Sequence, residues 1–316
     1  MPIATFVPLP ETSPFAPALV AVPPATSIPA FVLAWTGSDG QHKLNISRSD
    51  TGGTTWDKQL LRPNGPWEGS SAGPALAVHH GVVFVCWAAA ADQRLWFASS
   101  PDSGRTWSTK QPVADESSDG APALVSYLGM LVVAWRGTDG AGTLNLATSP
   151  DDGRTWSKVV LPEWSIAGPS LAQYASGAGF SYLFLAFTGT DHQIRTRSCQ
   201  QTDFASFGRP VASGEGQTLH ETSDSGPAIA VLDAHEGKDV VVAVSWRGTG
   251  DDHIHATYSL QGFSPYGNNT NAADTLTETN PAMITFSQFP AEDDRLVMSW
   301  SDPRQRLNFA AADRIM

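Results

Sequence analysis

The sequence is poor in cysteine, in lysine and in charged residues as a whole. It has two cysteines and five lysines among 316 residues, and charged residues make up 16% of the chain. An average soluble protein has about 25% charged residues. The two cysteines, Cys86 and Cys199, fit neither a disulfide framework nor a metal-binding knuckle. Long stretches of helix-forming residues are also scarce, which excludes a helical bundle.

The charge balance and the lack of long apolar runs exclude two kinds of partner. The net charge is 19 − 31 = −12 and no basic cluster offsets it, so we expect no binding to nucleic acid. No apolar run approaches the roughly 18 residues of a membrane span, so we expect no membrane association. The first residues lack the basic region of a secretory signal. This indicates a cytoplasmic protein, or a secreted one without a recognisable signal peptide.

Glycine, proline and tryptophan are abundant, and they occur in a repeated pattern. A proline, a small residue and an aliphatic residue recur six times, beginning at Pro17, Pro74, Pro122, Pro169, Pro227 and Pro281. Each triplet is followed by an apolar run that ends in an aromatic residue: Trp35, Trp87, Trp135, Phe187, Trp246 and Trp300. A polar turn and a further strand-like segment come next. Internal repetition of about 53 residues is typical of repeat architectures.

Each repeat is interpreted as four short strands joined by turns rich in glycine and aspartate, which is the pattern of a β-propeller blade. The sequence therefore predicts an all-β, single-domain, six-bladed propeller with four-stranded antiparallel blades. The expected blades span about residues 14–63, 71–113, 119–161, 166–212, 224–272 and 279–316. The last unit stops after its third strand, so we expect residues 3–9 to supply the missing strand and close the ring.

Two units carry an eight-residue turn of the form S-x-D-x-G-x-T-W. These turns are Ser100–Trp107 and Ser149–Trp156, and Ser49–Trp56 keeps the same frame with its acid displaced. Small polar side chains can bond nearby amides, and glycine accepts a positive φ. The turn resembles the Asp box of the sialidase-like, or BNR-repeat, β-propellers. The resemblance implies the same six-bladed fold, with a structural function for the turn on the face away from the ligand.

The resemblance does not extend to a catalytic set. Sialidases of this architecture use three arginines, a Tyr–Glu nucleophile pair and an aspartate as acid and base. The Arg-Ile-Pro segment that usually carries the first arginine is absent. Arg136 and Arg247 occupy equivalent turns of two repeats, so they are interpreted as repeat features. No catalytic residue is assigned, because fold alone does not determine chemistry.

A second motif precedes the repeated prolines. Glutamate, any residue and serine stand before five of them, beginning at Glu11, Glu68, Glu116, Glu163 and Glu221. The sixth unit has Thr275 and Thr277 at these positions. The loops that carry this E-x-S motif connect neighbouring blades on the face opposite the S-x-D-x-G-x-T-W turns. The motif either joins adjacent blades through hydrogen bonds, or its glutamates bind a ligand near the mouth of the central channel.

The candidate ligand-binding residues follow from the second interpretation. They are Glu11, Glu68, Glu116, Glu163, Glu221, Trp67, Trp164, His220, Arg136 and Arg247. Trp67 and Trp164 occupy variable positions of the E-x-S loops, where an aromatic ring can stack on a sugar. We expect no metal site and no cofactor, with a structural cation in the channel as an alternative. The pair His79-His80 is interpreted as a solvated strand end.

Three functions are compatible with these features. The favoured hypothesis is a non-catalytic, lectin-like propeller that binds glycans at the E-x-S face. The alternatives are a sialidase-like glycoside hydrolase, which needs paired carboxylates, and a cofactor-free enzyme acting on a small molecule in the channel, such as a cyclase. In each case we expect a monomer whose partner is a carbohydrate or another small molecule.

Overall fold

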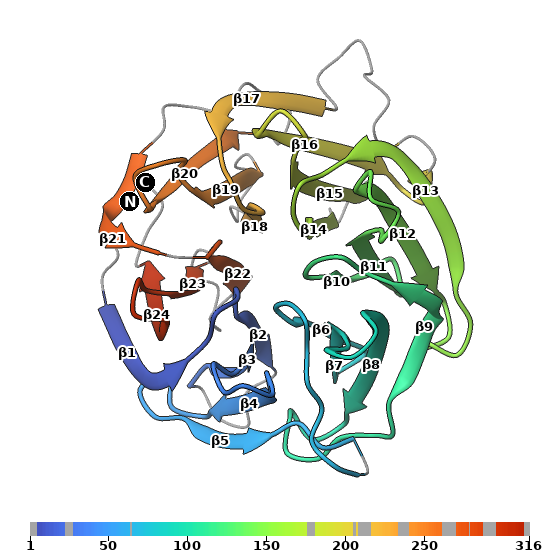
Figure 1. Ribbon diagram of the computed structural model, residues 1–316, viewed down its shortest axis with the longest axis vertical. Coiled ribbons are helices and arrows are strands. Elements are labelled where there is room, and N and C mark those ends of the chain that lie inside the picture. Colours follow the sequence, from blue (N-terminus) through green and yellow to red (C-terminus); the bar gives the residue numbers. More distant parts are fainter. Residues whose placement is uncertain are drawn as a thin grey trace.

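The computed structural model describes residues 5–22, 28–63, 65–175, 181–204, 207, 216–232, 240–260, 270–277, 279–286 and 295–312. These residues form six four-stranded antiparallel sheets, arranged in a ring as the blades of a β-propeller (Figure 1). The predicted fold is therefore confirmed. The described part holds no helix long and apolar enough to cross a membrane.

The first three blades follow the chain without interruption. Blade 1 consists of β2 (Ala18–Val22), β3 (Ala30–Thr36), β4 (Leu44–Ser49) and β5 (Asp57–Leu60). Blade 2 consists of β6 (Ala75–His79), β7 (Val82–Ala88), β8 (Arg94–Ser100) and β9 (Gln111–Ser117). Blade 3 consists of β10 (Ala123–Tyr127), β11 (Met130–Arg136), β12 (Thr143–Ser149) and β13 (Ser157–Trp164).

The remaining blades complete the ring. Blade 4 consists of β14 (Ser170–Ala175), β15 (Ser181–Thr188), β16 (Gln193–Gln200) and β17 (Gly216–Thr222). Blade 5 consists of β18 (Ala228–Leu232), β19 (Val241–Arg247), β20 (His253–Leu260) and β21 (Thr270–Leu276). Blade 6 consists of β22 (Ala282–Phe286), β23 (Arg295–Ser301), β24 (Arg306–Ala312) and, from the other end of the chain, β1 (Thr5–Thr12).

The first strand of each blade lies nearest the axis of the ring, and the fourth lies at the rim (Figure 1). The second strands are the core of the protein: β3 is buried at all seven positions, and Trp87, Trp135 and Trp246 are fully buried. Neighbouring blades cover both faces of each second strand. This explains why these strands are continuously apolar instead of alternating.

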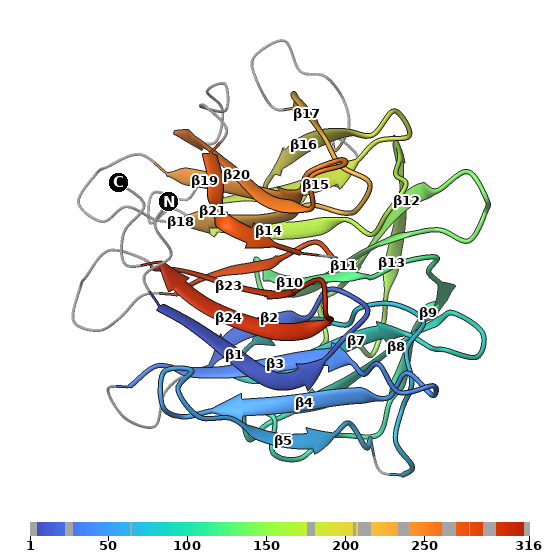
Figure 2. The same ribbon diagram turned by 60° about the vertical axis from the view of Figure 1, so that its left-hand side comes forward.

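The two ends of the chain meet in blade 6. β1 pairs antiparallel with β24, with Phe6 opposite Ala310 and Pro8 opposite Asn308, and the two strands run side by side in Figure 2. The closing strand is thus confirmed for residues 5–9, whereas residues 3 and 4 lie outside the described residues. Closure of this kind removes the open seam between the last and first blades.

The S-x-D-x-G-x-T-W turns have the same hydrogen bonds in both copies. In the first copy, Ser100 Oγ accepts the amide proton of Gly104 (2.7 Å), and Asp102 accepts the amide proton (2.8 Å) and hydroxyl proton (2.6 Å) of Thr106. The second copy repeats these contacts at 2.8 Å each. In the variant turn of blade 1, Thr51 Oγ1 replaces the carboxylate and accepts the Thr55 amide proton (2.9 Å).

The glycine of these turns joins neighbouring blades. Gly153 has φ +90°, and a Cβ there would lie 2.3 Å from the ring of Phe97 in blade 2. Gly53 in blade 1 approaches Phe309 of blade 6 in the same way. A side chain is excluded both by the left-handed backbone and by the aromatic ring packed against it. The turn therefore stabilises the contact between blades.

Candidate functional site

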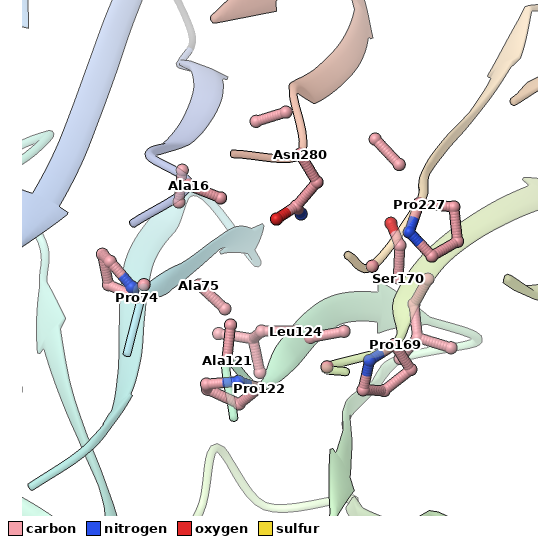
Figure 3. Close-up of a pocket in the computed structure, with 18 of the residues that line it drawn as sticks. Ala16, Pro74, Ala75, Ala121, Pro122, Leu124, Pro169, Ser170, Pro227 and Asn280 are labelled. Carbon is pink, nitrogen blue, oxygen red and sulfur yellow. The ribbon is translucent and has the colours of Figure 1, made fainter. Parts of the chain in front are cut away.

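A cavity of about 710 Å³ runs along the axis of the propeller. Its wall is made by the first strands and the loops that precede them, with contributions from all six blades. Proline and small apolar side chains such as Pro74, Ala121 and Pro169 face it, and the Asn280 amide projects toward its centre (Figure 3). The wall therefore combines apolar side chains with polar groups.

The charged groups at the cavity are already partnered. Asp119 pairs with Arg136, and the Arg136 guanidinium also donates to Ser165 O from its Nε (2.8 Å). Asp224 Oδ1 lies 2.9 Å from His192 Nδ1. Arg136 thus links the loops before and after blade 3. None of the five E-x-S glutamates belongs to the cavity wall.

The serines of the E-x-S motif join adjacent blades. The Ser70 amide donates to His42 O of blade 1 (3.0 Å), and its hydroxyl donates to Ala88 O of blade 2 (2.8 Å). Ser165 makes the same two contacts with blades 3 and 4, at 2.9 and 2.8 Å. The serines and the threonine of the sixth unit are at most 1% exposed: Ser13, Ser70, Ser118, Ser165, Ser223 and Thr277. Four of these hydroxyls donate to a backbone carbonyl of the following blade and so link neighbouring blades: those of Ser70, Ser118, Ser165 and Thr277.

Four of the five E-x-S glutamates form an ion pair with a cation of the next blade. The pairs are Glu11–Lys58, Glu68–Lys110 (2.8 Å), Glu116–Lys158 (2.7 Å) and Glu163–Arg197 (2.6 Å). Each cation also lies over an aromatic ring of its own blade, as Lys158 does over Trp135 at 5.5 Å. The glutamates therefore lie toward the outside of the ring, between blades.

The other predicted residues are dispersed. Glu221 is half-buried on β17 and His220 beside it is exposed. Trp164 is 50% exposed at the end of β13, whereas Trp67 is half-buried with Lys43 Nζ 5.0 Å from the centre of its ring. Arg247 donates from Nε to Asp252 Oδ1 (2.8 Å). The structure does not gather these side chains into one site.

A second cavity, of about 510 Å³, lies between blades 2 and 3 on the E-x-S face. We call it the blade 2–3 pocket. Its polar wall consists of Asp115, Glu116, Ser117, Thr138, Asp139, Thr143, Asn145 and Lys158, and Trp135 and Val160 contribute apolar surface. Glu116 is the one sequence-predicted residue in this wall. The pocket thus combines carboxylates, hydroxyls, an amide and an ammonium group.

The carboxylates of this pocket are held in place by ion pairs and hydrogen bonds. Glu116 pairs with Lys158 and Asp115 pairs with Arg94. Asp139 Oδ1 accepts amide protons from Ala141 (3.1 Å) and Gly142 (3.0 Å). Hydrogen bonds from Thr143 and these amides lower the pKa of Asp139. Fixed carboxylates of this kind are good acceptors for hydroxyl groups.

Sequence reasoning missed Lys158 and Asp139, although a signal for the lysine was present. Glu68 and Glu116 are each followed by a lysine 42 residues later, and these lysines are Lys110 and Lys158. The equal spacing in a chain with only five lysines could have indicated a repeated ion pair. Asp139 could not be assigned, because turns with aspartate occur throughout the sequence.

The interpretation of His79-His80 as a solvated strand end was half wrong. His80 has an exposed side chain, but His79 is only 1% exposed and its Nδ1 lies 2.8 Å from Ser126 Oγ of blade 3. The strand end packs against the next blade, which sequence periodicity cannot show.

The fold and its sites define a six-bladed β-propeller, and comparisons with solved structures agree. No protein-family model and no curated protein matches the sequence. AofleA from Arthrobotrys oligospora has a TM-score of 0.69 at 12% identity, over 98% of this chain and 86% of that one. The Aleuria aurantia lectin, crystallised with α-methyl-L-fucoside, has a TM-score of 0.67 at 13% identity, over 96% and 93%. A Hadza microbial sialidase, Hz136, has a TM-score of 0.64 at 16% identity, over 94% and 65%.

These similarities establish the fold. The similar structures include both a fucose-binding lectin and a glycoside hydrolase, so they leave open whether the chain is an enzyme. The function therefore depends on the side chains of the two cavities and not on the fold.

Proposed function

We propose that the protein is a non-catalytic, glycan-binding propeller whose ligand binds in the blade 2–3 pocket. The observation that carries this proposal is the set of carboxylates that lies beside the Lys158 ammonium and the hydroxyls of Thr138 and Thr143 in one pocket. Sugar hydroxyls donate and accept hydrogen bonds at once. A wall that offers acceptors and donors side by side suits them.

The Glu116–Lys158 pair is the centre of the proposed site. The side chains of these residues are 24% and 36% exposed, so a ligand can reach both charged ends. The carboxylate accepts a hydrogen bond from one sugar hydroxyl, while the ammonium donates a hydrogen bond to the neighbouring hydroxyl. Hydrogen bonds to charged groups contribute about 1.5–3 kcal/mol each, and the exposed Val160 offers apolar contact to the ring carbons of the sugar.

The similarity to a sialidase keeps a glycoside hydrolase as the second candidate. Such an enzyme needs one carboxylic acid whose pKa is raised, so that it is protonated before catalysis. The aspartates with shifted pKa values in the described part of the chain all have lowered values: Asp102, Asp139, Asp151, Asp191, Asp251 and Asp302. This pattern favours binding over acid catalysis.

A glycan array with the purified protein tests the proposal. We expect binding to a defined set of glycans, and we expect the Glu116→Gln variant to bind them roughly 10–100-fold more weakly, because one charged acceptor is lost. Glu11→Gln is the matched control: it breaks the same type of ion pair, with Lys58, at the junction of blades 6 and 1.

Each outcome is informative. Equal binding by the parent and the Glu116→Gln variant would contradict the assignment of the site, as would an equal loss in the Glu11→Gln variant. If the parent binds no glycan, the proposal fails. A panel of fluorogenic glycosides then tests the hydrolase, and soaking small molecules into crystals tests the axial cavity.

A further inference from the structure

On the face opposite the E-x-S loops, a histidine pair of blade 2 meets an aspartate of blade 3. His79 is the last residue of β6 and His80 follows it in the turn to β7, whereas Asp152 lies in the turn between β12 and β13. Asp152 Oδ1 is 3.3 Å from His79 Nε2 and 3.4 Å from His80 Nδ1. One potential metal ligand of each side chain lies within 4.8 Å of the other two.

The buried histidine has an unused ligand atom directed at this cluster. His79 is 1% exposed, and its Nε2 has no hydrogen-bond partner among the described residues. Its other ring nitrogen, Nδ1, lies 2.8 Å from Ser126 Oγ. When Nδ1 carries the proton and donates it to Ser126, the lone pair of Nε2 points toward Asp152. A buried nitrogen left unpaired in this way has a free-energy cost that a bound ion would offset.

The arrangement has the composition and spacing of a zinc site. Two imidazole nitrogens and a carboxylate are typical ligands of Zn²⁺, and a hydrogen bond to the second ring nitrogen is the usual way to orient a histidine ligand. Bonds of about 2.0–2.1 Å in a tetrahedron place ligand atoms roughly 3.3–3.4 Å apart. The distances from Asp152 to both histidines, 3.3 and 3.4 Å, match this value.

The neighbouring junction shows that the cluster is not required by the repeat. In blade 3 the position of His79 is occupied by Tyr127, whose ring packs edge-on against Phe204 of the following blade at 6.3 Å. The place of Asp152 in the turn of blade 2 is occupied by Ser103. An aromatic pair therefore fills the equivalent space elsewhere, and the two histidines and the aspartate are particular to blades 2 and 3.

We propose that His79, His80 and Asp152 bind a zinc ion, or a similar borderline transition-metal ion, that links blade 2 to blade 3. Ser126 orients His79. The side chains of His80 and Asp152 are 63% and 52% exposed, so water or an external ligand can take the fourth coordination position from the solvent side. Burial and the neighbouring His80 lower the pKa of His79, against the opposite effect of Asp152. Hard ions such as Mg²⁺ and Ca²⁺ prefer oxygen ligands and should bind poorly.

Calorimetric titration of the full chain with ZnCl₂ tests the proposal, after removal of any affinity tag and of bound metal with EDTA. We expect about one Zn²⁺ per chain and a rise of the Tm by a few degrees, because the ion binds only the folded state. His80→Ala and Asp152→Asn should each weaken binding at least tenfold, and Ser126→Ala should weaken it by about 10–100-fold. His80 and Asp152 are exposed, so these variants keep the core of the protein intact.

His192→Ala is the matched control, because His192 also pairs with an aspartate, Asp224, but has no third metal ligand among the described residues. The Zn²⁺ affinity of this variant should equal that of the parent. Visible absorption of the Co²⁺-substituted protein reports the geometry: an intense tetrahedral spectrum, lost in Asp152→Asn, is expected. The proposal would be overturned if the parent does not bind Zn²⁺, or if His80→Ala and Asp152→Asn bind it as tightly as the parent. A weak, octahedral Co²⁺ spectrum would also overturn it.

Discussion

The contacts between neighbouring blades differ between the two faces of the propeller. On the E-x-S face the junctions between blades repeat: a buried hydroxyl occupies all six, and a glutamate paired with a cation recurs at four. On the opposite face two of the turn glycines also repeat their contact with an aromatic ring, but other side chains differ, with His79 and Asp152 at one junction and Tyr127 and Phe204 at the next. Contacts that repeat stabilise the ring, because every blade needs a neighbour. Contacts that occur once, such as that of His79 with Asp152, are not explained by closure of the ring.

The closing strand is the strongest way to disturb the ring as a whole. Deletion of residues 2–10 removes most of the ladder between β1 and β24 and the buried Leu9. We expect the Tm to fall by roughly 10 °C or more, since several kcal/mol of stability are lost. Differential scanning calorimetry measures the change, and an unaltered Tm would show that closure contributes little.

A single buried hydroxyl tests the repeated links of the E-x-S face. In the Ser165→Ala variant the hydrogen bonds to Thr188 O (2.8 Å) and Ala167 O (2.7 Å) are lost. We expect a loss of about 1–3 kcal/mol in the free energy of unfolding, measured with urea. Ser38→Ala is the control, because the exposed Ser38 hydroxyl donates to Gln305 Oε1 (3.0 Å) and to no buried group among the described residues. A similar loss in both variants would argue against a special contribution of the buried links.

The contribution of the S-x-D-x-G-x-T-W turn on the opposite face can be measured from the stability of the protein at acid pH. Burial would raise the pKa of Asp102, but hydrogen bonds from the hydroxyl and amide of Thr106 and from Ser100 outweigh it and lower the pKa to about 2. A lowered pKa stabilises the folded state above the unfolded value of 3.8, and this contribution is lost as the pH falls toward 2. We expect the acid-induced decrease in stability to be shallower in Asp102→Asn. Urea denaturation at several pH values measures it, and parallel curves would refute the assignment.

The fold could be predicted in detail because it is a repeat. Buried second strands must be apolar and must end in a large side chain, so Trp87 and Trp135 recur at a constant position. The closing strand β1 was predictable because the last unit is one strand short. The buried serines were also visible as a motif, since each makes the same local contact.

The site was less predictable, because it depends on what lies across a junction. The sequence placed Glu116 on the E-x-S face, but its partner Lys158 and the neighbouring Asp139 join it only when blades 2 and 3 pack together. The other predicted residues, such as His220 and Trp164, share that face without sharing a pocket. Periodicity reports the face of an element and not the distance between two elements.

The sequence by itself determined the number of blades, the strands of each blade and the closure of the ring, because strand pattern and turn chemistry are local and repeated. The tertiary structure alone decided which side chains meet between blades. It paired four of the E-x-S glutamates with cations of the next blade. It also placed His79 beside Asp152, which lies 73 residues later in the sequence. The physical reason is that neighbouring blades contact each other through side chains. The repeated strand pattern does not specify which side chains face each other, so these pairs form only when the blades pack together.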